Sequence, residues 1–192
     1  PDGKTILPLR NHGVTVMSLG LMVPENEAIV WRGPMLMGAL QQMLTQVQWG
    51  ILDLLIVDLP PGTGDVQLTL SQKTDLFGAI VVSTPQDVAL LDARKGIDMF
   101  KKLNVPIIGL IENMSSFECT QCGLVHHPFG KGTLEAEASK IGTDVIADLP
   151  LDVETRMAAD NGSPIVITKP NGAVANAFLE LADRLIISDL FE

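Results

Sequence analysis

Apolar residues fall along the chain in short continuous runs, separated by longer segments of mixed character. Runs of roughly four to eight apolar residues are typical of strands buried on both faces, as in a parallel sheet. They predict strands at 52–57, 78–83 and 106–111, with shorter strands at 14–19 and 144–147. Apolar residues at helical spacing predict helices at 35–48, 87–103, 135–141, 151–161 and 173–187.

The order of these elements predicts an α/β fold. Strand 78–83, helix 87–103 and strand 106–111 follow one another through short links, which is the arrangement of a βαβ unit. The repeated alternation predicts a doubly wound, mostly parallel sheet flanked by helices, whose ligands bind beyond the carboxyl ends of the strands. The last helix is amphipathic, and the side chains expected to face the core are Phe178, Leu181, Leu185 and Ile186.

Composition and charge narrow the function further. At 192 residues, 46% of them hydrophobic, the chain fits one domain with a substantial core. A net charge of −10, with no Tyr and two Trp, disfavours nucleic acid and anionic membrane as partners. No apolar run reaches the roughly 18–20 residues of a membrane span, and no segment resembles a signal peptide. We expect a protein of the cytoplasm or mitochondrial matrix, and a start at Pro1 instead of Met suggests that an upstream part has been removed.

The segment after the first buried run carries the first candidate chemistry. Asp58 ends the apolar run, and a loop rich in Pro and Gly follows at once. This is the layout of a Walker B strand and switch II, in which the Asp holds Mg²⁺, usually through water. Gly62, four residues on, can turn its backbone N–H toward a γ-phosphate because no side chain blocks the approach. The same residues fit a rigid turn capped by Asp58 equally well.

Cys119 and Cys122 form a CxxC pair in a polar loop after strand 106–111. The spacing fits a redox pair, half of a zinc site or half of a cluster site. The pair does not open a helix, which disfavours the thioredoxin-like alternative. Zinc and [4Fe–4S] both prefer four ligands. Either two chains supply two cysteines each, or His126 or His127 completes a zinc site; a pair of exposed loop histidines without a metal is the commoner case.

Two lysine-containing segments come close to a phosphate-binding loop without matching it. Residues 3–5 (GKT) have the end of the motif GxxxxGK[ST], but Pro8 and Gly13 do not continue as a helix. Residues 130–133 (GKGT) fail because a glycine follows Lys131. Neither segment is predicted to bind phosphate.

Several segments taken together resemble the Mrp (ApbC-like) branch of the ParA/MinD P-loop ATPases, which are iron–sulfur cluster carriers. They are residues 31–34, 57–67, 83–90 and 112–115 and the cysteine pair. The resemblance runs over essentially the whole chain, and a CxxC after the ENMS segment at 112–115 separates this branch from the partitioning and septum-site ATPases. It implies a P-loop NTPase fold without the N-terminal P-loop strand. Residues 1–192 would be a single domain, the C-terminal portion of an Mrp-type nucleotide-binding domain.

The resemblance also implies a nucleotide site for ATP and Mg²⁺. Asp58 would be the Walker B aspartate, and Gly62 would sense the γ-phosphate. Asn113 would contact the adenine. The other wall of the adenine site would be Pro150, Leu151 and Asp152. The family's P-loop and its two lysines would lie upstream of Pro1, so this chain alone is expected not to hydrolyse ATP at a useful rate.

For the cysteines, the resemblance implies a [4Fe–4S] cluster bridged by Cys119 and Cys122 of two chains in a homodimer. Members of the family bind the cluster transiently and pass it to apo-proteins. Two other interpretations stay open: a non-catalytic metal-binding dimerisation module, and a ParA/MinD-like positioning ATPase. The acidic end of the chain, at 189–192, disfavours the last, since a membrane-targeting helix should be basic there.

Overall fold

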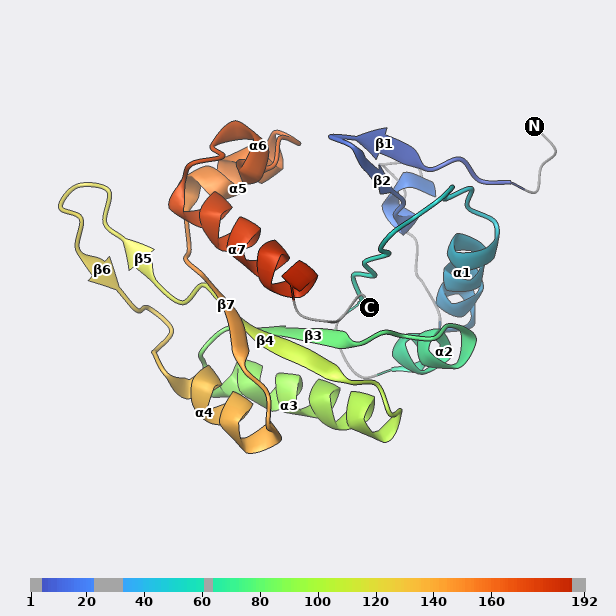
Figure 1. Ribbon diagram of the computed structural model, residues 1–192, viewed down its shortest axis with the longest axis horizontal. Helices are drawn as coiled ribbons and strands as arrows, with labels where there is room; N and C mark the ends of the chain where they lie inside the picture. The colour runs from blue at the N-terminus through green and yellow to red at the C-terminus, as the bar shows by residue number, and fades with distance from the viewer. Residues whose placement is uncertain (1–4, 23–32, 61–63, 188–192) are drawn as a thin grey trace. The chain divides into compact units, whose positions relative to one another are not determined.

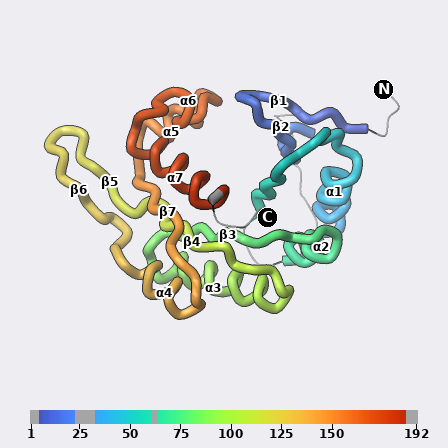
Figure 2. The backbone as a smooth tube through the Cα atoms, viewed as in Figure 1, coloured from blue at the N-terminus to red at the C-terminus, as the bar shows by residue number. Residues whose placement is uncertain are grey.

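The computed structural model describes residues 5–22, 33–60 and 64–187, and these divide into two compact units at the boundary between Leu76 and Phe77. Figure 1 shows the elements and Figure 2 the path of the backbone. Each unit is described below by itself. No helix in the described ranges is both long enough and apolar enough to cross a membrane.

A three-stranded parallel sheet forms the centre of the second unit. Its strands are β3 (Ala79–Ser83), β4 (Ile107–Asn113) and β7 (Val145–Leu149), in the order β3-β4-β7. The strands pack so closely that a Cβ atom at Gly109 would lie 2.5 Å from Cγ2 of Ile146. A larger residue at Gly109 would force the Ile146 side chain to move, which favours glycine in the middle of β4.

Helices cover both faces of this sheet, as Figure 1 shows. One face is covered by α3 (Asp87–Lys102) and α4 (Thr133–Ile141), and α7 (Ala173–Ile187) packs along β7 on the other. The short helices α5 (Val153–Asp160) and α6 (Ile165–Thr168) precede α7. The core beneath α3 and α4 consists of Leu90, Ile97, Leu110, Leu134 and Ala138. The expected doubly wound α/β architecture, parallel and flanked by helices, is confirmed.

A two-stranded antiparallel hairpin extends from the second unit and is the yellow element at the left of Figures 1 and 2. It consists of β5 (Phe117–Glu118) and β6 (Val125–His126). The sequence pattern predicted only a polar loop here, because strands of two residues leave no periodic signal.

The first unit is built from a hairpin and two helices. Strands β1 (Leu9–Asn11) and β2 (Val14–Val16) pair in antiparallel fashion and lead to a short 3₁₀ helix, η1 (Leu19–Met22). Helix α1 (Gly33–Thr45) packs against α2 (Asp65–Lys73). Helix α2 was not predicted, because its sequence is largely polar.

The strand predicted at 52–57 is wrong. These residues form no strand, and their apolar side chains are exposed, with Leu54 at 51% and Ile56 at 81% of full exposure. An apolar run becomes a strand only where a neighbour accepts its hydrogen bonds, and no described residue pairs with it. The run instead lines an open cavity of about 1040 Å³ together with apolar residues of α1.

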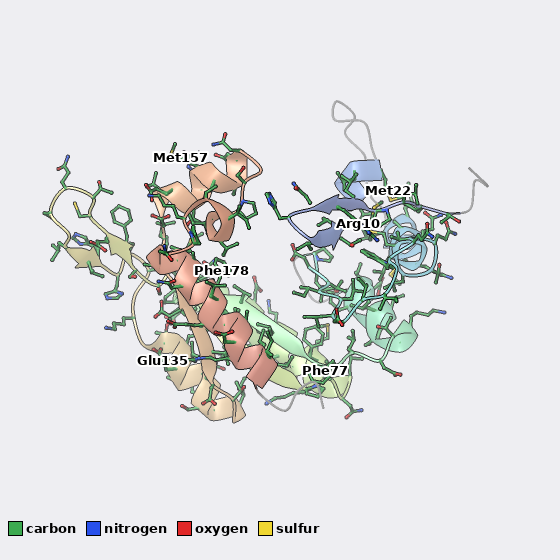
Figure 3. The ribbon with its side chains drawn as sticks, turned by 45° about the horizontal axis from the view of Figure 1, so that its top comes forward. Arg10, Met22, Phe77, Glu135, Met157 and Phe178 are labelled. Atoms are coloured by element: carbon green, nitrogen blue, oxygen red, sulfur yellow. The ribbon has the colours of Figure 1, made fainter. Side chains whose placement is uncertain are left out.

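The predicted inner face of the last helix is also wrong in part. The bounds of α7 agree with the prediction, but Phe178 is 38% exposed and Ile186 is 68% exposed. Figure 3 shows Phe178 on this helix. Among the side chains of α7 that the structure describes, Val174 and Ala175 are buried, and Val174 packs with Ala158 of α5 and Ile165 of α6.

Candidate functional site at the carboxyl edge of the sheet

The chain turns sharply where β4 ends. Asn113 is the last residue of the strand, and Met114 follows in the left-handed region at φ = 55°. The Asn113 side chain supports this turn, because its Oδ1 accepts a hydrogen bond of 3.0 Å from the Met114 N–H. An asparagine at this position therefore holds the local backbone, whatever ligand it also contacts.

Two backbone hydrogen bonds join this turn to the end of β7. The N–H of Ser115 donates to the carbonyl of Leu149 at 3.1 Å, and the N–H of Leu151 donates to the carbonyl of Ser116 at 2.7 Å. Asn113 itself is the register partner of Leu149. The residues expected to contact adenine, Asn113 and the segment Pro150, Leu151 and Asp152, are thus brought side by side at one edge of the sheet.

Asp152 has a structural task at this edge. Its Oδ2 accepts hydrogen bonds of 2.7 Å from both the backbone N–H and the hydroxyl of Thr155, so it caps the N-terminus of α5. Burial opposes the charge of this carboxylate, but the bonds from Thr155 and the nearby Lys169 outweigh it and lower the Asp152 pKa. Leu151 beside it is exposed and offers an apolar surface.

The cysteine pair lies at the tip of the β5–β6 hairpin. The Cys119 N–H donates to the carbonyl of Leu124 at 2.9 Å, and the Gly123 N–H donates back to the carbonyl of Cys119 at 2.8 Å. Backbone N–H groups of Gln121 and Cys122, together with the Cys122 side chain, lower the pKa of the Cys119 thiol. Thiolate is the form that binds metal, and both cysteines are free, with Cys122 exposed.

Within the described ranges, no three His, Cys, Asp or Glu side chains come together as a group that can hold a metal ion. His126 and His127 do not join the two thiols in such a group. His127 instead places its Nδ1 atom 2.8 Å from the carbonyl oxygen of Ser115. A four-ligand site built on the cysteine pair is therefore not preformed among the described residues.

Glu112 is a feature of this edge that sequence analysis missed. It is 3% exposed, and its Oε2 atom has no hydrogen-bond partner among the described residues. Burial raises the pKa of Glu112, as do Glu135 on α4 and Asp148 on β7, while His127 and Lys131 act in the opposite direction. Figure 3 labels Glu135 on its helix. The sequence did contain a signal that could have identified Glu112, namely a charged residue near the end of an otherwise apolar strand.

Asp58 belongs to the first unit, whereas the other described candidates belong to the second. It is exposed, follows the extended run 52–57, and lies along the cavity of that unit. Gln67 on α2 contacts two nearby residues: its Nε2 donates to the Pro60 carbonyl at 3.1 Å and its Oε1 accepts from the Gly64 N–H. Gly62 lies outside the described residues. The roles of Asp58 and Gly62 stay predictions.

The second unit has a parallel sheet with helices on both faces. Candidate ligand residues lie at the carboxyl edge of this sheet, and a reduced thiol pair lies beyond that edge. This is the class of α/β fold that binds nucleotides, here with a cysteine site in addition. A family model of the ParA group, described as the NUBPL iron-transfer P-loop NTPase, matches residues 1–186. The chain belongs to this family.

Individual relatives agree with the family. The chain is 50% identical over 181 residues to the iron-sulfur cluster carrier protein of Pseudomonas fragi, covering 94% of the chain and 63% of the relative. It is 48% identical over 179 residues to the mouse iron-sulfur cluster transfer protein NUBPL, covering 93% and 56%. A solved nucleotide-binding protein of Archaeoglobus fulgidus, in complex with ADP, matches 83% of the chain and 62% of its own at a TM-score of 0.66 and 34% identity. The chain thus spans 56–63% of these proteins' lengths.

Proposed function

We propose that the chain is part of an iron–sulfur cluster carrier that holds a [4Fe–4S] cluster between two protomers and passes it to apo-proteins. The observation that carries this proposal is the thiol pair at an exposed hairpin tip, with the Cys119 pKa lowered by backbone N–H groups. The names of the two relatives, a cluster carrier and a cluster transfer protein, point to the same cargo.

The chemistry of the hairpin fits a cargo that is taken up and given away. Two cysteines per chain supply half of the four thiolates that such a cluster prefers, so a homodimer completes the set. Exposure of Cys122 lets an incoming thiolate of an apo-protein reach the cluster. A buried site would hold a cluster more firmly but would hinder its transfer.

The carboxyl edge fits the adenine end of a nucleotide. The Asn113 Oδ1 atom is engaged by Met114, which leaves its Nδ2 group as the donor to an adenine ring nitrogen. The exposed Leu151 supplies an apolar surface for the ring, and Asp152 holds that wall in place as the α5 cap. We propose ATP with Mg²⁺ as the nucleotide, with Asp58 near the metal. We further propose that residues 1–192 form the C-terminal portion of one nucleotide-binding domain.

We propose partners and a location to match. The partners are a second copy of the chain and apo-proteins that accept the cluster. A net charge of −10 disfavours nucleic acids and anionic membranes as further partners. The location is the cytoplasm or the mitochondrial matrix, where thiols stay reduced.

Anaerobic reconstitution with iron and sulfide tests the proposal. We expect about four iron atoms per two chains, and loss of the bound iron in Cys119→Ala and Cys122→Ala. His126→Asn is the matched control, because it alters a hairpin residue close to the pair and should keep the iron. Tight binding of one zinc ion per chain, lost when His126 or His127 is changed, would overturn the carrier and support a metal-binding dimerisation module.

A further inference from the structure

The hairpin that carries the cysteines has little of its own to hold it in place. Its strands pair through two residue pairs, Phe117 with His126 and Glu118 with Val125. A two-stranded hairpin is at best marginally stable in water when isolated. A cluster shared by two chains needs four sulfur atoms held in a fixed arrangement, so the base of the hairpin must be restrained.

Ser115 is a fixed point next to that base. The residue is 2% exposed, and its N–H is bonded to the carbonyl of Leu149 at the end of β7. The next residue, Ser116, accepts the N–H of Leu151. These bonds attach the segment that leads into β5 to the central sheet.

His127 ties the returning strand of the hairpin to the same point. It follows β6 directly, and its Nδ1 atom lies 2.8 Å from the carbonyl oxygen of Ser115. A carbonyl only accepts hydrogen bonds, so Nδ1 carries the proton here. The two ends of the hairpin are thereby joined across its base, twelve residues apart in the sequence.

The His127 imidazole is also close to Glu112, at the end of β4 in the central sheet. Glu112 is buried at the end of β4, three residues before Ser115, and His127 and Lys131 are the cationic or ionisable groups that offset its burial. Glu135 and Asp148 are the acidic groups that face it. His127 is thus close enough to the buried end of β4 to affect the Glu112 pKa, while it also contacts Ser115 at the base of the hairpin.

We propose that His127 is a positioning residue, which fixes the base of the cysteine hairpin to Ser115 through its Nδ1–H group. By this bond it restrains where Cys119 and Cys122 lie relative to the sheet. The ring acts on the cargo through the hairpin and not as a ligand. The inference rests on the proposed carrier function for its biological meaning, although the hydrogen bond can be tested without any cluster.

Two substitutions of His127 distinguish the role of its Nδ1–H donor from that of the rest of the imidazole ring. In His127→Asn the side-chain Nδ2 group takes nearly the place of Nδ1 and can still donate to Ser115. In His127→Leu a side chain of similar reach has no donor. His126→Asn is the control, because the His126 ring makes no hydrogen bond within the described ranges. Thermal unfolding of each variant checks that the fold is kept.

Amide hydrogen exchange in the cluster-free protein is the first measurement. The reporters are the N–H groups of Cys119 and Gly123, which are bonded across the hairpin. We expect about fivefold to tenfold faster exchange in His127→Leu, as loss of one net hydrogen bond allows, and less than about twofold change in His127→Asn and His126→Asn. Equal exchange in His127→Leu and wild type, or equal acceleration in both His127 variants, would overturn the positioning role.

Cluster loading and transfer give the second measurement. We expect His127→Leu to load iron but to lose the cluster to a chelator several times faster than wild type, and His127→Asn to restore the wild-type rate. If the wild type itself loads no cluster, the proposed function fails while the exchange result still decides the role of His127. If His127→Asn binds no metal although its exchange is normal, the ring is a ligand and the positioning role is overturned.

Discussion

Two buried glutamates in the second unit show how differently its two regions are built. Glu137 lies on α4, on the side of the sheet covered by α3 and α4, at 5% exposure, and its Oε2 accepts from Arg94 Nη2 at 2.7 Å and Lys140 Nζ at 3.3 Å. The hydrogen bond from Arg94, against the effect of burial and with help from Lys140, lowers the Glu137 pKa. Glu112 is as deeply buried at the carboxyl edge, yet one of its oxygens has no partner among the described residues, and burial raises its pKa.

The difference between Glu137 and Glu112 indicates which region of the second unit is arranged for stability. Between α3 and α4, the buried Glu137 is matched by the cations Arg94 and Lys140 above a closely packed core. At the carboxyl edge, three unfavourable features lie within four residues: Met114 has a positive φ, and among the described residues neither Glu112 Oε2 nor the Ser115 hydroxyl has a hydrogen-bond partner. Buried polar groups without partners are rare in proteins and are found chiefly at functional or strained sites, so their presence here agrees with the site proposed at this edge.

The largest effect on stability is expected from breaking the ion pair between Arg94 and Glu137. Arg94→Met removes the main partner of Glu137 and leaves a buried carboxylate with Lys140 alone. We expect the midpoint of thermal unfolding, followed by circular dichroism, to fall by about 4–8 °C.

Lys95→Met is the matched control for Arg94→Met. Lys95 pairs with Asp92 one turn along the same helix, but both side chains of that pair are exposed. Its removal should change the midpoint by less than about 1 °C. An equal drop in both variants would mean that burial of Glu137 does not set the cost.

A smaller effect of opposite sign is expected at the carboxyl edge. Glu112→Gln replaces a buried carboxylate, one of whose oxygens has no partner among the described residues, by a neutral amide of the same shape, so we expect the midpoint at pH 7 to rise by about 2–4 °C. Because the folded-state pKa of Glu112 is raised, its favourable contribution is present below the unfolded pKa and is lost as pH rises through the folded pKa. The gain should therefore vanish as pH falls toward roughly 4.

The effect of Glu137→Gln on stability should depend on pH in the opposite way to that of Glu112→Gln. The folded-state pKa of Glu137 is lowered, so its contribution is present above the unfolded pKa and is lost as pH falls through the folded pKa. This variant should be less stable than wild type at pH 7 and should approach the stability of wild type in acid.

The Glu112→Gln prediction has its own contradicting outcome. A loss of stability in Glu112→Gln at pH 7 would show that His127 and Lys131 stabilise the Glu112 carboxylate more than burial destabilises it.

The helices and strands of the second unit were predictable because their signals are local. Periodicity alone gave α7 its bounds and placed β3 and α3 to within one residue. The run at 52–57 has the same composition as a buried strand, but a strand also needs a neighbour, and the local pattern carries no information about one. The exposure of this run is therefore beyond what its sequence can predict.

The candidate site divides in the same way. The cysteine pair is recognisable from its spacing, whereas Asn113 was singled out only through the resemblance to a known family. The bond from His127 to Ser115 and the pair between Arg94 and Glu137 join residues 12 and 43 positions apart, so they become visible only in three dimensions. The resemblance implies a place for Asp152 in the adenine site, which stays a prediction, whereas its use as a helix cap follows from its hydrogen bond with the Thr155 N–H.

The smallest effect is expected at the cysteines. Cys119→Ser and Cys122→Ser alter side chains at the tip of a hairpin outside the core clusters, and neither thiol is needed to bury apolar surface. Without a cluster, each variant should therefore unfold within about 1 °C of wild type. A hairpin that carries cargo can lose its cysteines and keep the fold, whereas a structural metal site cannot. A drop of more than about 3 °C in metal-free protein would place the thiols with Glu137 among the groups that stabilise the fold, and would remove the contrast between the two regions.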